Sequence, residues 1–174
     1  MEIVNFTESL YVSFLFLYFM KELVDNLVHV DPSGAEGLVL LDTCFIFSHL
    51  DHKELLPEKF ATTSFNAEEL VYVTTHHLGK MKSRVRNFLK NSNVVVVDIG
   101  VSPGDKDAEK EYVNSVDEHL LQHIADPSDA VLIATALRTK SNVLTKDKHH
   151  LFTSELINYL SDKGVKVHRE LRDM

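Results

Sequence analysis

The fold is decided by the stretch from Asp126 to Asp147, which reads DPSDAVLIATALRTKSNVLTKD and predicts a helix, a turn and a strand in succession. Asp126 can cap the helix, and Pro127 suits its first position. Asp129 falls in the first turn, where a carboxylate faces the positive end of the helix dipole. A short apolar run then leads to Asp147, at the predicted end of a buried parallel strand. This helix and strand can therefore bring two carboxylates together, and converging carboxylates usually hold a hard cation.

Working outward from this stretch, the chain after Gly37 alternates short apolar runs with segments of helical periodicity. The predicted strands cover residues 38–41, 59–64, 93–98 and 164–167, in addition to the run before Asp147. The predicted helices of this region cover residues 43–56, 66–77, 80–90, 105–124 and 151–161, with Asn66 as the cap of the second. Apolar strands that alternate with helices predict an α/β sandwich with a mainly parallel sheet.

The first 36 residues have a different character. Between Leu10 and Met20 only Ser13 is not apolar, and helical spacing continues to Val28, which predicts a helix of about five turns. The apolar run is shorter than the roughly 20 residues that cross a bilayer, so we expect no stable membrane span. We expect the helix to pack on its own domain, to join copies in a homodimer or higher oligomer, or to dock a partner. The predicted organisation is an N-terminal apolar helix and linker in residues 1–36 and one domain in residues 37–174.

The composition of the chain excludes several kinds of protein and of metal site. A length of 174 residues with 44% hydrophobic residues suits one domain with a full core plus an appendage. The single cysteine, Cys44, excludes an internal disulfide and a thiolate metal cluster, and it favours a reducing, cytoplasmic setting. The net charge of -8 does not favour a general attraction to nucleic acid, so any such contact needs a local basic patch.

Two further acids are expected at the same edge of the sheet as Asp129 and Asp147. Asp42 ends the predicted strand 38–41, and Glu69 lies in the first turns of the helix that follows the second strand. Ligands of open parallel sheets bind at the carboxyl ends of the strands, where these residues collect. Crowded carboxylates raise one another's pKa, so a divalent cation or a shared proton is expected among them.

Four segments resemble the successive motifs of PIN-domain ribonucleases, notably the VapC-type toxins of toxin–antitoxin pairs. They are Leu-Leu-Asp42-Thr-Cys-Phe-Ile, Asn-Ala-Glu-Glu69-Leu, Asp129-Ala-Val-Leu-Ile-Ala-Thr-Ala-Leu and Val-Leu-Thr145-Lys-Asp147. The resemblance runs from about Gly37 to the C-terminus and implies a three-layer α/β/α fold. It also implies an acidic site that binds Mg²⁺ or Mn²⁺ and hydrolyses RNA phosphodiester bonds. The chain departs from the family pattern in the apolar segment that precedes the first motif.

Position by position, the resemblance matches Asp42, Glu69, Asp129 and Asp147 to the metal-site acids. Thr43 and Thr145 match motif hydroxyls that orient them, and Lys146 stands where Arg is frequent. Phosphodiester hydrolysis agrees with such a site, because oxygen-held divalent ions neutralise the phosphate, activate water and stabilise the leaving oxygen.

A basic strip is predicted to contact the RNA. No acid occurs between residues 76 and 90, where the cations are Lys80, Lys82, Arg84, Arg86 and Lys90. Together with Lys146 these side chains would bind phosphates, and the alternative is an ordinary solvated helix face. The histidine pairs His76-His77 and His149-His150 do not chelate easily, because neighbours on a helix point about 100° apart. We expect them to face solvent or to contact RNA.

Each acid also has a structural explanation when taken alone. Asp42 could cap the next helix, Asp129 could complement the helix dipole, and Glu68 competes with Glu69. Asp126 is interpreted first as a cap and second as an outer metal ligand, and Asp98 is interpreted as a turn residue. Two other functions compete with the nuclease: a non-catalytic PIN-like subunit for RNA binding or assembly, and a receiver-like signalling domain. A receiver-like domain needs a pair of acids near the first strand, and Asp42 has no acidic neighbour on its strand.

Overall fold

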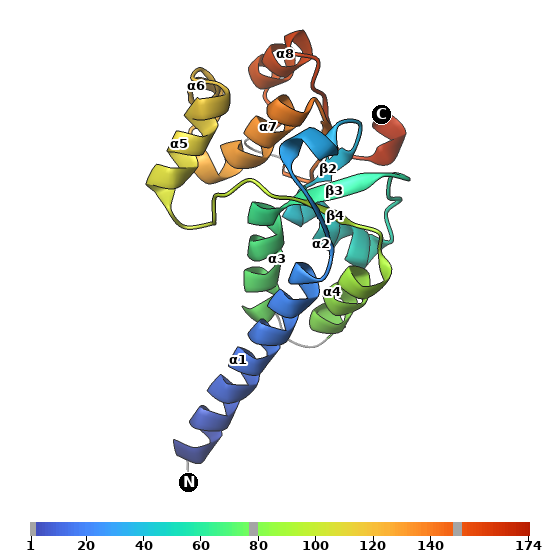
Figure 1. Ribbon diagram of the computed structural model, residues 1–174. Helices are drawn as coiled ribbons and strands as arrows, with labels where there is room; N and C mark the ends of the chain where they lie inside the picture. Colours follow the sequence, from blue (N-terminus) through green and yellow to red (C-terminus); the bar gives the residue numbers. More distant parts are fainter. Residues whose placement is uncertain (1–2, 77–79, 148–150) are drawn as a thin grey trace.

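The computed structural model describes residues 3–76, 80–147 and 151–174, with side chains of the first helix described from Phe14 onward (Figure 1). The described sheet has six parallel strands in the order β1-β4-β3-β2-β5-β6. These strands are β1 (Val28–Val30), β2 (Val39–Leu41), β3 (Phe60–Thr63), β4 (Val95–Val97), β5 (Asn142–Leu144) and β6 (Val167–His168). The α-helices are α1 (Ile3–Asp25), α2 (Thr43–His52), α3 (Ser64–His76), α4 (Lys80–Asn91), α5 (Lys106–Val116), α6 (Leu120–His123), α7 (Pro127–Thr139) and α8 (Ser154–Asp162).

Helices cover both faces of the sheet, which confirms the predicted three-layer α/β/α fold (Figure 1). Successive residues of a strand point to opposite faces, so neighbouring positions enter different cores. Leu40 of β2 joins the core formed with α5, α6, α7 and α8, whereas Leu41 joins the core formed with α1, α2, α3 and α4. Val143 and Leu144 of β5 divide in the same way.

The strand order reverses next to β2. From β2 the chain proceeds to β3 and then β4 on one side, and it crosses to β5 and β6 on the other. Strand β2 therefore pairs with β3 through Val39 and Phe60, and with β5 through Leu40 and Val143. Such a reversal leaves a crevice at the carboxyl ends of the two diverging strands, because the following connections run to opposite faces.

Some elements differ from the sequence prediction. Helix α1 ends at Asp25, and the next residues form the edge strand β1, where helical spacing predicted continuation to Val28. The predicted linker contains a 3₁₀ turn at Pro32–Ala35. The predicted helix 105–124 is interrupted after Val116 and divides into α5 and α6. Strand β1 thus lies in the same sheet as the rest of the chain, and a division into units at residue 37 stays a prediction.

Helix α1 packs against α3 and α4 through its C-terminal half, where Met20 and Val24 are buried. Its N-terminal half extends beyond the rest of the molecule in Figure 1. Phe14, Leu15 and Tyr18 are 68%, 54% and 64% exposed, so the helix displays an apolar surface. None of the described helices, α1 included, combines the length and hydropathy that a membrane crossing requires.

Candidate metal centre

A small cavity of about 60 Å³ lies at the carboxyl ends of β2 and β5, where the strand order reverses. Four carboxylates reach it from four segments: one directly after β2, one from α3, one from the first turn of α7 and one after β5. The lining residues are Asp42, Glu69, Asp129 and Asp147, together with Phe65, Asn66, Ser128, Leu132 and Leu151. The fold therefore assembles at one point the acids that the sequence singled out.

The Asp42 carboxylate is held by two neighbouring side chains. Its Oδ2 accepts a hydrogen bond from the Thr145 hydroxyl at 2.5 Å and one from the Cys44 thiol at 2.8 Å. The same Thr145 oxygen accepts the backbone N–H of Asp147 at 3.0 Å, and the backbone N–H of Lys146 donates to the Cys44 sulfur at 3.1 Å. Thr145 and Cys44 thus connect the ends of β2 and β5 and fix the orientation of Asp42.

Glu69 is held in a similar way from α2 and α3. The buried Thr43 hydroxyl donates to Oε2 of Glu69 at 2.6 Å. The Asn66 amide nitrogen lies 3.5 Å from the same oxygen and 3.4 Å from Oδ1 of Asp42, so it bridges the two acids. Asn66 was predicted to cap α3, and this prediction is wrong. The helix begins at Ser64, and the Thr63 hydroxyl accepts the Asn66 N–H at 2.9 Å. Its side chain is thereby turned toward the carboxylates.

Burial and mutual repulsion both act on the acids of the cavity. Burial raises the pKa of Asp42, the hydrogen bonds from Cys44 and Thr145 oppose this shift, and the charge of Asp147 adds to it. Burial likewise raises the pKa of Glu69 against the hydrogen bond from Thr43, and the charges of Asp42 and Asp129 raise it further. A divalent cation would relieve both effects, because it replaces lost solvation and neutralises the repelling charges.

Cys44 is a hydrogen-bond donor in this site and not a thiolate ligand. Burial, followed by the charge of Asp42, raises the pKa of its thiol to about 12. The sulfur consequently keeps its proton at neutral pH and donates it to Asp42. The oxygen atoms of the carboxylates are therefore the donors that the cavity offers to a cation.

The cavity fits a partly hydrated hard cation. Its donors are oxygens, which Mg²⁺ and Mn²⁺ prefer. Its volume of about 60 Å³ exceeds the roughly 30 Å³ that one water occupies in the liquid. Within the described parts of the chain, no three His, Cys, Asp or Glu side chains are placed to ligate one ion directly.

Three other acids lie outside the cavity. Oδ1 of Asp98 lies 2.9 Å from Nδ1 of His29, beside β1 and β4. Asp126 caps α7 as predicted, because its carboxylate accepts the backbone N–H of Ser128. Glu68 is exposed and accepts a hydrogen bond from Ser102. The adjacent Glu69 faces the cavity instead, since neighbouring helix positions point about 100° apart.

The basic residues are placed farther from the cavity or are paired. Nζ of Lys146 lies 2.6 Å from Glu54, and Arg84 lies 2.6 Å from Asp51 near the end of α2. Because α2 has 10 residues and starts beside Asp42, the Arg84 pair lies about 15 Å along the helix from that acid.

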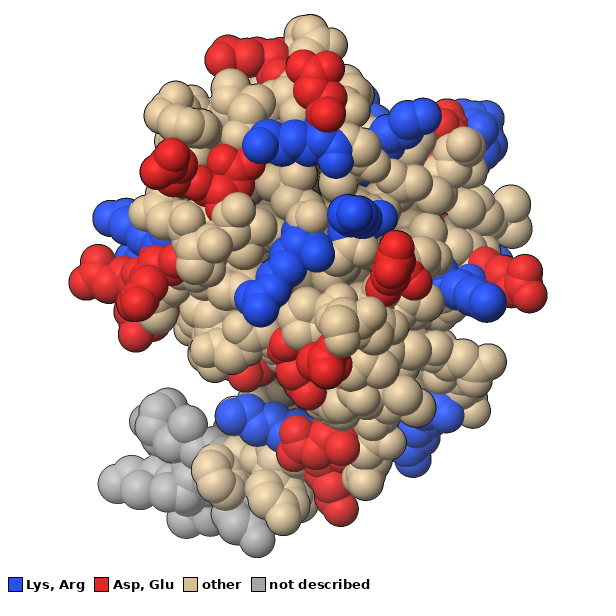
Figure 2. Space-filling view, turned by 45° about the horizontal axis from the view of Figure 1, so that its top comes forward, with Lys and Arg blue, Asp and Glu red and all other residues tan. Residues whose placement is uncertain are grey.

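The remaining cations of the basic strip lie on α4. Lys82 and Lys90 stand over the rings of Phe16 and Phe19 of α1, whereas Lys80 and Arg86 are exposed. On the described part of the face in Figure 2, acidic and basic side chains are interspersed.

The histidine pairs can be followed only in part. The ring of exposed His76 packs on Tyr72 at 4.6 Å, and its Nδ1 lies 2.8 Å from the Tyr72 carbonyl oxygen. His77, His149 and His150 lie outside the described residues.

Sequence reasoning missed three residues of the site: Cys44, Asn66 and Ser128. Local signals existed for two of them. Cys44 follows Asp42 by two positions. Asn66 precedes Glu69 by three positions, which places the side chains of Asn66 and Glu69 on one face of the helix. Ser128 adjoins Asp129, and its role depends on a contact with α5 that has no local signature.

Comparison with known proteins bears on the same part of the chain. The sequence model of the PIN domain matches residues 39–154, which extend from β2 to the start of α8 and include all four cavity acids. No curated protein and no solved structure matches the chain. The family match covers more than half of the 174 residues.

Proposed function

The chain belongs to the PIN-domain family, which typically comprises metal-dependent nucleases, and on this premise we propose that it is an endoribonuclease that hydrolyses RNA phosphodiester bonds. The observation that carries the proposal is the convergence of four carboxylates, from four separate segments, on one cavity. Such a concentration of half-buried negative charge opposes folding unless a bound ion compensates it, so a purely structural role does not account for it.

In this proposal Asp42, Glu69, Asp129 and Asp147 are the catalytic residues and would hold Mg²⁺ or Mn²⁺, either directly or through its bound waters. When bound, the ion neutralises phosphate charge, lowers the pKa of water and stabilises the leaving oxygen. Thr145 keeps Asp42 in place and Thr43 keeps Glu69 in place, through the hydrogen bonds described above. A cavity carboxylate that did not contact the ion directly would accept the proton of the attacking water.

The cations are proposed RNA contacts at two distances from the cleaved bond. Lys146, which is next to Asp147, would approach the nearest phosphates by exchanging its Glu54 partner. The strip on α4 would meet flanking nucleotides, since Arg84 lies about a full length of α2 from the cavity. Its members are Lys80, Lys82, Arg84, Arg86 and Lys90.

A non-catalytic RNA-binding or assembly subunit of the same fold is the competing proposal. Such a subunit does not need a cluster of carboxylates, whereas here four half-buried acids line one cavity. Membership of the PIN-domain family excludes the receiver-like signalling domain.

The nuclease proposal is tested with purified protein, a mixed single-stranded RNA and Mn²⁺. We expect the wild type to cut the RNA and Asp129→Asn to lose at least about a hundredfold in rate, because a ligand of the ion is removed. Asp98→Asn is the matched control, since Asp98 also follows a strand but pairs with His29 outside the cavity. Equal cutting by wild type and Asp129→Asn, or none by the wild type with Mn²⁺ over a range of pH, would refute the proposal.

We also propose that α1 joins copies of this chain into a homodimer or higher oligomer. Its exposed Phe14, Leu15 and Tyr18 would be covered by the same helix of a second copy. If the chain is the toxin of a toxin–antitoxin pair, an antitoxin protein is the other partner that this surface would suit. The single, protonated Cys44 is in keeping with a reducing, cytoplasmic setting.

Point variants test α1 more cleanly than its deletion, because Met20 and Val24 belong to the core. Replacing Leu15 and Tyr18 together by lysine is expected to convert the oligomer to a monomer in analytical ultracentrifugation. Leu55→Lys is the control, since Leu55 is 73% exposed and lies outside α1. A wild type that sediments as a monomer would contradict the proposal.

A further inference from the structure

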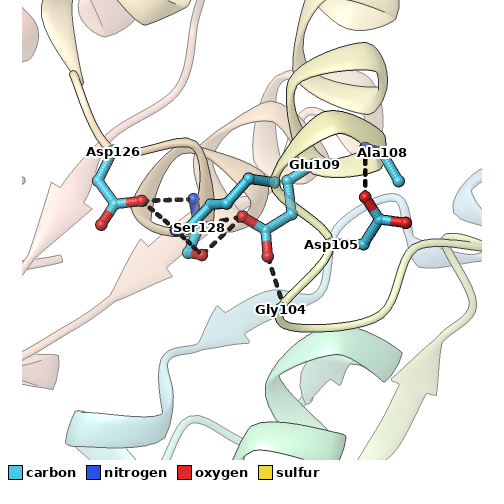
Figure 3. Close-up of polar contacts among 7 residues, drawn as sticks. Gly104, Asp105, Ala108, Glu109, Asp126 and Ser128 are labelled. Carbon is cyan, nitrogen blue, oxygen red and sulfur yellow. Dashed lines mark hydrogen bonds and ion pairs between the residues drawn. The ribbon is translucent and has the colours of Figure 1, made fainter.

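A buried carboxylate outside the cavity is connected to it through Ser128. Glu109 of α5 has an exposed fraction of 0%. Its Oε1 accepts the backbone N–H of Gly104 at 2.9 Å, and its Oε2 accepts the Ser128 hydroxyl at 2.7 Å (Figure 3). Nζ of Lys106 lies 3.4 Å from the same Oε2. The Glu109 side chain therefore forms hydrogen bonds both with the loop before α5 and with the start of α7.

Ser128 belongs both to this network and to the cavity. Its hydroxyl donates to Glu109 and accepts from Lys106 at 2.7 Å, while the residue lines the cavity next to Asp129. Nζ of Lys106 also donates to the carboxylate of Asp126, the cap of α7, at 2.6 Å. The first turn of α7 is thus fixed on its side facing α5 by hydrogen bonds that involve a buried charge.

We propose that Glu109 is a positioning residue: through Ser128 it fixes the first turn of α7 and so the place of Asp129 at the cation site. This inference rests on the proposed function. An apolar side chain would seal the contact between α5 and α7 without the cost of burying a carboxylate, but it would not fix the rotation of Ser128. Groups that orient metal ligands from outside the ligand shell typically change metal affinity by about ten- to a hundredfold when removed.

The experiment measures Mn²⁺ binding by titration calorimetry, with the metal alone and the full chain. Glu109→Gln and Ser128→Ala are each expected to weaken Mn²⁺ binding by about tenfold, and Ser128→Thr, which keeps the hydroxyl, to restore it. The double variant is expected to bind as each single variant does, because glutamine has one acceptor oxygen for the two donors of Glu109, so both changes weaken the same connection. This non-additivity separates positioning by Glu109 from direct ligation by Ser128.

Asp105→Ala is the control for a purely structural effect. Asp105 caps the helix that carries Glu109, through the backbone N–H of Ala108, and it lies outside the contact with α7 (Figure 3). This variant is expected to lower the melting temperature but to leave Mn²⁺ affinity within about twofold. If Glu109→Gln does not fold, Glu109→Asp takes its place, since the shorter acid does not reach Ser128.

The outcomes separate this role from the proposed function. Mn²⁺ binding by the wild type with unchanged affinity in Glu109→Gln would overturn the positioning role and leave the nuclease proposal intact. An additive loss in the double variant would overturn it as well. A wild type that does not bind Mn²⁺ would refute both proposals together.

Discussion

Replacing Asp42 by asparagine is expected to lower metal-dependent RNA cleavage by at least about a thousandfold. Charge stabilisation by a bound ion contributes several kcal/mol to lowering the barrier, and about 1.4 kcal/mol corresponds to a factor of ten in rate. Asparagine keeps the size of Asp42 and can still accept from Thr145, so the loss would reflect the missing charge. Cleavage is measured at saturating Mn²⁺, with Asp98→Asn as the unaffected reference.

The same variant is expected to unfold at a higher temperature than the wild type when metal is absent. The folded state raises the pKa of Asp42, so it holds a proton at a pH where the unfolded chain has released it. Stability therefore falls as pH rises from the ordinary pKa to the raised one, and the loss persists at neutral pH. Removing this charge should raise the free energy of unfolding by on the order of 1 kcal/mol, which corresponds to an increase of about 3 °C in the melting temperature.

Calorimetry in excess chelator measures the effect on stability. A lower melting temperature for Asp42→Asn would show that the Asp42 charge does not destabilise the metal-free fold. Undiminished cleavage by the variant would show that Asp42 is not a catalytic residue.

The fold class was predictable because the pattern of buried strands and helices is local. Runs such as Val94 to Val97 are apolar on successive positions, as expected for strands between two helical layers. Strand β1 was missed because it has only three residues and its apolar positions continue the helical spacing of α1. The break after Val116 is equally inconspicuous, since Asp117 lies in a polar segment that otherwise suits a helix.

The candidate site was predictable to the extent that topology alone determines it. Acids that follow parallel strands must meet at one edge, so Asp42 and Asp147 could be placed without coordinates. Glu109 could not, because a glutamate on a polar helix is normally solvated and nothing local shows that it is buried against α7. The pairing of Lys146 with Glu54 was hidden for the same reason, since the partners are far apart in sequence.

Mn²⁺ affinity is expected to fall steeply as the pH is lowered. Burial raises the pKa of Asp42 and of Glu69, so both carboxylates take up protons at a higher pH than ordinary acids do. A cation binds only the deprotonated form, and its binding therefore releases these protons. Below the raised pKa values, the affinity should fall by about tenfold per pH unit for each carboxylate that must be deprotonated.

As the pH is lowered from 7.5, we accordingly expect the dissociation constant for Mn²⁺ to start rising at a higher pH than the ordinary carboxylate pKa values would give. At pH 7.5, Mn²⁺ at a hundred times its dissociation constant should stabilise the fold by about 2.7 kcal/mol, an increase of roughly 8 °C in melting temperature. The same Mn²⁺ concentration should stabilise the fold less as the pH falls below the raised pKa values, because protons then compete with the ion for the carboxylates.

The variant Glu69→Gln separates the contributions of the two acids to this pH dependence. If both must lose a proton, the variant binds Mn²⁺ more weakly but with a shallower dependence on pH, because only Asp42 still titrates. An affinity of the wild type that stays constant as the pH is lowered from 7.5 to the ordinary carboxylate pKa values would mean that protons do not compete with the ion for either carboxylate. Such a result would contradict the raised pKa values as well as the assignment of both acids to the metal.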